Sequence, residues 1–274
     1  MPLKLGHIDY LNCVPLFHYL RNCGFDGEIV KGVPSTLNAM LARGEIDVSP
    51  SSSFEYGRSF TAYKLLPGYS ISAFGPVQSV MLFSHVSVDE LRGHRIYITG
   101  ESATSVNLLR VLLREYYGWD QVDTCVPDVP VEEMLAQGRA VLLIGDRALR
   151  LALASQPTVR YRYDLASLWR QFTAMPFVFA LWIVRNDVVD GKLASLQRLR
   201  QHLAASYARA RAELPELAAT VSRNSWISAD QLLDYWRCMS YELDEAHLAG
   251  LELFFELCVK YGYLKRRPKV EFVD

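Results

Sequence analysis

Residues 176–184 read PFVFALWIV, a stretch of almost purely apolar character. A run of this kind is typical of a strand that is buried on both faces of a sheet. A second apolar strand is expected at Val77–Ser84, before the middle third of the chain. Because paired strands that lead the chain into and out of a segment form a hinge, we predict two lobes that close on a ligand between them. The predicted lobes are 1–83 plus 186–274 and 84–185, with hinge crossover strands near 77–84 and 177–185.

Short apolar runs alternate with helical patterns over the rest of the first 185 residues. Further strands are expected at Leu3–Ile8, Glu28–Lys31, Ile46–Ser49, Ala62–Leu66, Tyr69–Ala73, Arg95–Thr99 and Ala140–Ile144. Helices are expected to begin at Pro15 and Pro34, to cover Ser52–Arg58, Val88–Arg92 and Val131–Gln137, to follow Ser105, and to end at Thr173. This alternation predicts an α/β protein whose sheets are mainly parallel and doubly wound, each flanked by helices.

The chain from Gly191 onwards is almost entirely helical in pattern. Leu196, Leu199, Leu203 and Tyr207 form one apolar stripe. Further helices fit Ala229–Met239 and Glu245–Tyr261. We therefore predict a helical C-terminal segment, whose stripe could cover one lobe or form a homodimer contact.

The composition narrows the class of protein. The 274 residues are 50% hydrophobic and carry 29 basic and 30 acidic side chains. This balance argues against a nucleic-acid partner, which would need a basic surface. The basic cluster at 265–269 is interpreted as a solvated tail, with an anion patch as the alternative. Five widely spaced cysteines without a C-x-x-C motif favour reduced thiols over disulfides or a zinc site.

The N-terminus and the apolar runs bear on location. Residues 1–8 read as a strand without a secretory signal, and the apolar runs are far shorter than a membrane span. We expect a cytoplasmic protein that has no membrane partner and acts on a small molecule.

Hydroxyl and amide side chains follow several predicted strands. The first strand is followed by Asn12, the third by Ser51 and Ser52, and the strand after Arg95 by Ser102, Thr104 and Ser105. Helix N-termini with such side chains bind carboxylates or phosphates without an arginine. Helix capping is the alternative at each site, since serine and threonine are good N-caps.

No standard catalytic signature accompanies these residues. His7 could be a general base, although a structural role is favoured, and Asp146 could orient a substrate hydroxyl or cap the next turn. Glu55 lies three residues after Ser52 and is interpreted as part of a capping box. The aromatic residues Trp169, Phe177, Phe179 and Trp182 are expected in the core, with one of them walling the cleft.

A series of motifs runs in order along the chain. It comprises Gly6-His7-Ile8 with Tyr10-Leu11-Asn12 and Pro15, Gly44-x-x-Asp47-x-x-Pro50, Gly75-Pro76-Val77 with Ser79, Ser102-x-Thr104-Ser105, Ile144-Gly145-Asp146 with Ala148-Leu149, Leu168-Trp169, and residues 176–180. Their order and spacing resemble the chorismate dehydratase family of the futalosine route to menaquinone. The resemblance runs from residue 3 to about 185 and more loosely through the helical tail. The dihydroxynaphthoate synthase family of the same pathway shares the fold and is the nearest alternative.

The resemblance implies a two-lobed, type 2 periplasmic-binding-protein-like fold recruited as a hydro-lyase. It implies that water leaves chorismate to give 3-[(1-carboxyvinyl)oxy]benzoate, without a cofactor or metal. Asn12 and Asp146 are the expected catalytic residues, and the base is either the enolpyruvyl carboxylate of the substrate or a protein residue. The expected substrate-binding residues are Ser102, Thr104 and Ser105 for one carboxylate and Ser51, Ser52 and Ser79 for the other.

Two alternative functions, from other classes of protein, remain open. The fold could serve a non-catalytic small-anion binding protein, for which the absence of an export signal is the counterargument. It could also be the ligand-sensing domain of a transcription factor, although no DNA-binding segment is attached.

Overall fold

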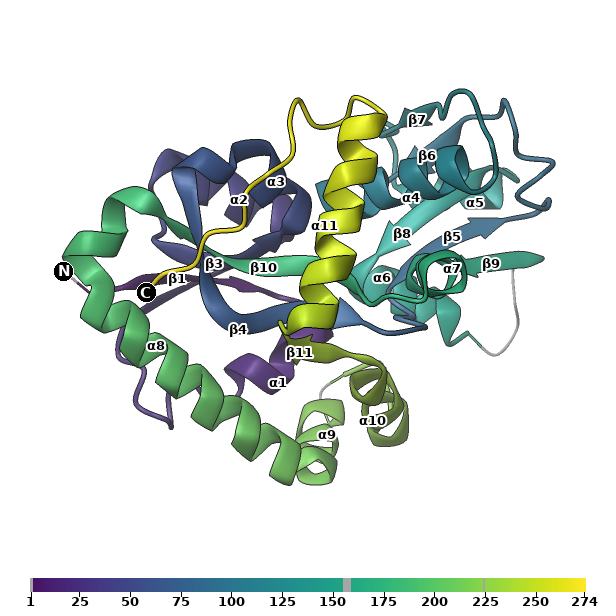
Figure 1. The fold of residues 1–274 in the computed structure, drawn as a ribbon. Helices are drawn as coiled ribbons and strands as arrows, with labels where there is room; N and C mark the ends of the chain where they lie inside the picture. The colour runs from purple at the N-terminus through teal and green to yellow at the C-terminus, as the bar shows by residue number, and fades with distance from the viewer. Residues whose placement is uncertain (1, 155–158, 224) are drawn as a thin grey trace.

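The computed structural model describes residues 2–154, 159–223 and 225–274, which form two lobes side by side, each built on one sheet (Figure 1). The larger lobe contains a six-stranded sheet in the order β11-β4-β10-β3-β1-β2. Its strands are β1 (Lys4–Ile8), β2 (Glu28–Gly32), β3 (Val48–Ser52), β4 (Tyr63–Ala73), β10 (Phe177–Arg185) and β11 (Ser240–Glu242). The smaller lobe contains a five-stranded sheet in the order β7-β6-β8-β5-β9. Its strands are β5 (Val80–Ser84), β6 (Ile96–Ile98), β7 (Thr124–Cys125), β8 (Ala140–Ile144) and β9 (Tyr161–Asp164).

The chain passes between the two sheets twice. It leaves the larger sheet after β4, enters the smaller one at β5, and returns to the larger sheet at β10. Each of the two apolar strands expected to act as hinges therefore belongs to a single sheet. The division of the chain at 83/84 and 185/186 stays a prediction. The linking segments between the sheets are 74–79 and 165–176, the second of which contains helix α7 (Leu165–Thr173).

The expectation of mainly parallel sheets is wrong, because both sheets are mixed. β1 is parallel to β2 and β3, whereas β10 runs antiparallel to both β3 and β4. In the smaller sheet β5 is antiparallel to β8 and β9. β5 and β10, the strands that follow the two crossings, run opposite to the strands beside them. An apolar run shows that a strand is buried on both faces but not its direction.

Helices flank both sheets, as expected. Those before β10 are α1 (Val14–Phe17), α2 (Pro34–Arg43), α3 (Ser53–Ser59), α4 (Ala103–Glu115), α5 (Val131–Ala136), α6 (Gly145–Ala152) and α7, with short 3-10 turns η1 (Leu11–Cys13) and η2 (Phe60–Ala62). The helix expected at Val88–Arg92 is instead a turn, in which the N–H of Leu91 bonds to the carbonyl oxygens of Ser87 and Val88. Val88 and Leu91 are nonetheless buried, which explains the apolar spacing.

The predicted helical C-terminal segment is confirmed. It contains α8 (Asn186–Ala212), α9 (Leu214–Ser222), α10 (Ala229–Cys238) and α11 (Glu245–Lys260), with β11 between the last two. The stripe on α8 lies against its own lobe, where Leu196 and Leu203 are fully buried. α11 contacts both α4 of the smaller lobe and β10 of the larger one (Figure 1). Within the described residues, no helix combines the length and apolar character needed to cross a membrane.

Candidate functional site

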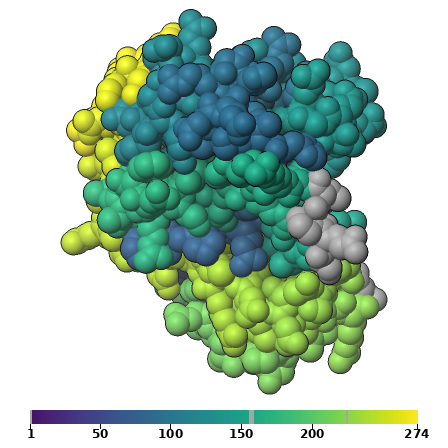
Figure 2. Space-filling view, turned by 90° about the vertical axis from the view of Figure 1, so that its right-hand side faces the viewer, coloured from purple at the N-terminus to yellow at the C-terminus, as the bar shows by residue number. Residues whose placement is uncertain are grey.

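A cavity lies between the two lobes and takes residues from both. Its lining includes five of the predicted site residues, namely Asn12, Ser52, Ser79, Ser102 and Ser105. The space between the lining side chains that no atom fills is about 520 Å³, a figure that includes the part open to solvent. Figure 2 views the molecule from the side of the smaller lobe, with the light-green surface of α9 and α10 below the blue and teal surface of that lobe.

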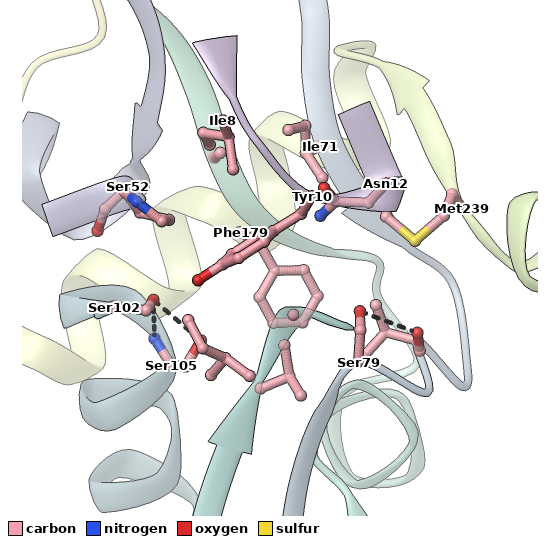
Figure 3. Close-up of a pocket in the computed structure, with 16 residues that line it drawn as sticks. Ile8, Tyr10, Asn12, Ser52, Ile71, Ser79, Ser102, Ser105, Phe179 and Met239 are labelled. Carbon is pink, nitrogen blue, oxygen red and sulfur yellow. Dashed lines mark hydrogen bonds between the residues drawn. The ribbon is translucent and has the colours of Figure 1, made fainter. Parts of the chain in front are cut away.

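The N-terminus of α4 forms one end of this cavity. Ser102 is the N-cap: its Oγ accepts a hydrogen bond from the backbone N–H of Ser105 at 3.2 Å and lies 3.0 Å from Ser105 Oγ. Figure 3 shows both side chains facing the cavity. The capping role is therefore confirmed, and it leaves the hydroxyls at the positive end of the helix dipole, where an anion is stabilised.

Thr104 does not line the cavity, because its hydroxyl contacts the larger lobe. Thr104 Oγ1 lies 2.5 Å from Ser52 Oγ and accepts a hydrogen bond from the Phe54 N–H at 3.1 Å. Ser52 Oγ in turn accepts from the Thr104 N–H at 3.2 Å. These contacts join the start of α3 to the start of α4 across the cleft.

The expected capping box at Ser52 and Glu55 is wrong. Ser52 makes no side-chain cap hydrogen bond to its own helix, since its hydroxyl faces Thr104. Glu55 instead pairs with Arg58 on the next turn. Burial raises the pKa of Glu55, whereas the Arg58 guanidinium opposes that rise. Ser52 and Glu55 have the spacing of a capping box, but the Ser52 hydroxyl contacts Thr104 of the other lobe instead of its own helix.

Asn12 lies on the turn η1 at the other end of the cavity. Its Oδ1 is buried and has no hydrogen-bond partner among the described residues. Figure 3 shows the amide facing the cavity beside Met239. A buried polar atom without a partner is uncommon in a folded protein. The amide oxygen is thus available to a ligand.

Ser79 lies on the same side of the cavity as Asn12 in Figure 3, whereas Ser52, Ser102 and Ser105 lie on the opposite side. Its Oγ accepts a hydrogen bond of 2.9 Å from the hydroxyl of Tyr235 and donates to the Val77 carbonyl oxygen at 3.3 Å. Ser79 is 2% exposed. The rings of Tyr10 and Phe179 lie between the two sides.

Ser51 and Asp146 do not line this cavity, and their predicted contacts with substrate stay predictions. Ser51 is fully buried on β3, and its Oγ has no partner among the described residues. Asp146 lies in the first turn of α6, and its Oδ1 accepts a hydrogen bond from the Leu11 N–H at 3.0 Å. Burial raises the pKa of Asp146 to about 6. Asp146 therefore contacts the turn that carries Asn12.

Tyr10 is a cavity residue for which the sequence predicted no role. Its hydroxyl donates to Glu101 Oε2 at 3.0 Å, and Glu101 also pairs with Arg147 at 3.1 Å. A Cβ atom on Gly145 would lie 2.8 Å from the Tyr10 ring, so the ring packs directly on the backbone of α6. The only signal in the sequence was the place of Tyr10 within a motif.

The aromatic and histidine residues fall largely as expected. Trp169, Phe177 and Trp182 are core residues, and Phe179 is the aromatic residue that walls the cavity. His7 stacks on Phe17 with ring centroids 3.9 Å apart, outside this cavity, and burial lowers its pKa to about 4. Across the described ranges, no group of three or more His, Cys, Asp or Glu side chains is placed to hold a metal ion.

The sixteen lining residues drawn in Figure 3 include no lysine or arginine. Any anion in the cavity would therefore be held by hydroxyls, by the Asn12 amide group and by backbone N–H groups at helix starts. The apolar wall is formed by Ile8, Ile71, Val77, Val80, Ile144 and Met239. A lining of this kind suits an organic acid with an apolar ring.

Residues 3–260 match a family model described as "Menaquinone biosynthesis". The chain is 35% identical over 268 residues to a Thermus thermophilus protein named chorismate dehydratase, covering 93% of this chain and 94% of that protein. A Campylobacter jejuni protein of the same name is 33% identical over 181 residues, which is 64% of each chain.

Solved structures share the fold at lower identity. A protein from Archaeoglobus fulgidus matches with a TM-score of 0.72 and 17% identity, covering 96% of this chain and 98% of that one. The periplasmic aliphatic sulphonate binding protein of Escherichia coli matches with a TM-score of 0.68 and 16% identity, covering 97% of this chain and 89% of that one. These likenesses confirm the expected periplasmic-binding-protein-like fold.

Proposed function

The chain belongs to the menaquinone-biosynthesis protein family, and from this premise we propose that it removes water from chorismate to give 3-[(1-carboxyvinyl)oxy]benzoate. The relatives named chorismate dehydratase support this activity. We also propose that the enzyme is a hydro-lyase and that it needs neither cofactor nor metal. The cytoplasmic location expected from the sequence is part of the same proposal.

The observation that carries the proposal is the division of the cavity into two polar ends with aromatic rings between them (Figure 3). Ser52, Ser102 and Ser105 lie at one end, and Ser79 and Asn12 lie at the other. Chorismate is a ring with two carboxylates, so its ring would lie beside Tyr10 and Phe179. The absence of lysine and arginine from the lining fits carboxylates that are held by hydroxyls and by the start of α4.

The first carboxylate would be bound by Ser102, Ser105 and the backbone N–H groups that begin α4. Ser52 was expected with Ser79 at the second carboxylate, but it lies at the Ser102 end of the cavity. It would therefore approach the first carboxylate from the larger lobe, where Thr104 holds its hydroxyl against α4. Thr104 would then support the site through Ser52, although a direct contact with substrate remains the sequence prediction. Ser79 would donate to an oxygen atom at the opposite end.

The chemistry requires removal of the C3 proton and departure of the C4 hydroxyl group. Breaking both bonds makes the ring aromatic, which supplies a large driving force, so positioning and charge stabilisation can provide much of the catalysis. We propose that the enolpyruvyl carboxylate of the substrate takes the C3 proton and passes it to the departing C4 hydroxyl group, which leaves as water. Asn12 would hydrogen-bond near the reacting ring carbon or to the leaving hydroxyl, and Asp146 would act on this step through the Leu11 N–H.

Purified protein mixed with chorismate and a metal chelator provides the test, with products followed by liquid chromatography and mass spectrometry. We expect loss of one water molecule and an aromatic enolpyruvyl ether. Unchanged chorismate would overturn the proposal. In that event the substrate of the sister dihydroxynaphthoate synthase is the next compound to test, and saturable binding of chorismate without turnover would identify a binding protein.

A further inference from the structure

We propose that the stretch from Tyr235 to Tyr241 is a positioning element that orients Asn12 through its backbone and sets Ser79 as a hydrogen-bond donor, an inference that rests on the proposed function. The stretch spans the end of α10 and the start of β11. Figure 1 shows β11 and α10 beside α1, which follows the Asn12 turn directly. Among its residues Met239 lines the cavity, whereas Tyr235, Trp236 and Tyr241 do not.

Two side chains of this stretch bind the backbone around Asn12. Trp236 Nε1–H donates to the Leu11 carbonyl oxygen at 2.8 Å, and the Tyr241 hydroxyl donates to the Asn12 carbonyl oxygen at 2.7 Å. Both side chains are at most 3% exposed. Pro15 has no N–H, so the Leu11 carbonyl cannot receive the i+4 hydrogen bond of a regular helix. The Leu11 carbonyl accepts the Val14 N–H, and the indole supplies a second donor.

These bonds matter because, among the described residues, no hydrogen bond orients the Asn12 amide oxygen. Asn12 Oδ1 has no partner among the described residues, so the direction of the side chain depends on the backbone that carries it. That backbone is held on one side by Asp146, through the Leu11 N–H, and on the other by Trp236 and Tyr241. Loss of one of these bonds would allow the turn to rotate, and small displacements of a reacting group reduce turnover strongly.

Tyr235 acts on the second polar group at this end of the cavity. Its hydroxyl donates to Ser79 Oγ at 2.9 Å. Burial raises the pKa of Tyr235, so the hydroxyl keeps its proton. Because Ser79 Oγ accepts this bond, its own proton points elsewhere, at present to the Val77 carbonyl oxygen at 3.3 Å. A bond of that length is readily exchanged for one to a substrate carboxylate, which needs a donor.

The two tyrosine hydroxyls can be removed without changing the packing, by Tyr241→Phe and Tyr235→Phe. The matched control is Tyr56→Phe, since the Tyr56 hydroxyl is also buried and donates to a backbone carbonyl oxygen, that of Lys269, at 2.9 Å. We expect Tyr241→Phe to lower kcat with chorismate about tenfold while KM changes less than about twofold. We expect Tyr235→Phe to raise KM about tenfold, because Ser79 loses its fixed role as donor.

Wild-type turnover of chorismate tests the proposed function separately from the positioning role. An inactive wild-type protein would contradict the proposed function itself. If the wild type is active, Tyr241→Phe kinetics equal to those of Tyr56→Phe would overturn the positioning of Asn12. A change in Tyr235→Phe confined to kcat, or none at all, would overturn the role assigned at Ser79. Equal loss of kcat and equal loss of melting temperature in all three variants would show a structural role alone and would also overturn the inference.

Discussion

Tyr10 of the larger lobe donates a hydrogen bond of 3.0 Å across the cleft to Glu101 of the smaller lobe. Glu101 is also held by Arg147, which pairs with Glu132 at 2.5 Å. Tyr10 at the same time forms part of the cavity wall. One side chain therefore connects closure of the lobes with the shape of the site.

Tyr10→Phe removes this hydrogen bond and should favour the open cleft. A hydrogen bond to a charged group contributes about 1.5 kcal/mol, which corresponds to about a tenfold rise in KM for chorismate. Steady-state kinetics measure this. Tyr19→Phe is the matched control, because the Tyr19 hydroxyl donates to Glu213 at 2.7 Å outside the cavity lining. An unchanged KM in Tyr10→Phe would show that the contact does not contribute to closure.

Gly145→Ala should disrupt the packing of α6 on Tyr10. Gly145 has a φ of +60°, and an added Cβ would lie 2.8 Å from the Tyr10 ring. Gly138→Ala is the control, since its φ of +78° imposes similar backbone strain with no atom within 4 Å of the added Cβ. Left-handed backbone costs an alanine about 1 kcal/mol in both variants. Only Gly145→Ala should also lose about tenfold or more in kcat/KM, and equal kinetics in the two variants would argue against the contact.

Asp146 predicts a pH dependence of stability with a definite sign. Burial raises the pKa of Asp146 to about 6 from its ordinary value of 3.8. The folded protein thus holds this proton more tightly than the unfolded chain, and the free energy of unfolding falls as pH rises between these two values. Asp146→Asn removes this contribution. The free energy of unfolding of the variant minus that of the wild type should therefore rise by about 1–2 kcal/mol from about pH 4.5 to about pH 7.5.

Urea unfolding at the two pH values measures the difference. Asp128→Asn, at an exposed position, controls for loss of one negative charge. If Asp146→Asn differs from the wild type by the same free energy at both pH values, the Asp146 carboxyl does not have the raised pKa.

Much of the fold could be predicted because burial leaves a pattern in the sequence. The apolar run Ala140–Ile144 predicted β8 with the correct bounds, and Ser102 was expected where it caps α4. The direction of β10 was not predictable in this way, because a parallel and an antiparallel buried strand have the same apolar pattern. The turn at Val88 has helical spacing but too few residues to continue as a helix.

The sequence predicted only those site residues that lie within its motifs. Ser102, Thr104 and Ser105 share one helical turn, and sequence alone does not show that Thr104 faces Ser52 rather than the cavity. The contacts of Trp236 and Tyr241 reach the Asn12 turn across 225 and 229 residues of sequence and end on backbone carbonyls. A backbone acceptor carries no side-chain signature, so nothing near Asn12 pointed to these partners.

The most direct test of the central claim compares chorismate turnover by wild type, Asn12→Ala and Asn38→Ala. Asn38 is the matched control, because it is buried with an unpartnered Oδ1 among the described residues but lies on α2, outside the cavity lining. We predict that wild type and Asn38→Ala convert chorismate to an aromatic product lighter by one water. Asn12→Ala should be about a hundredfold slower with an unchanged unfolding midpoint. Wild-type turnover in Asn12→Ala, or no turnover by the wild type, would contradict the account.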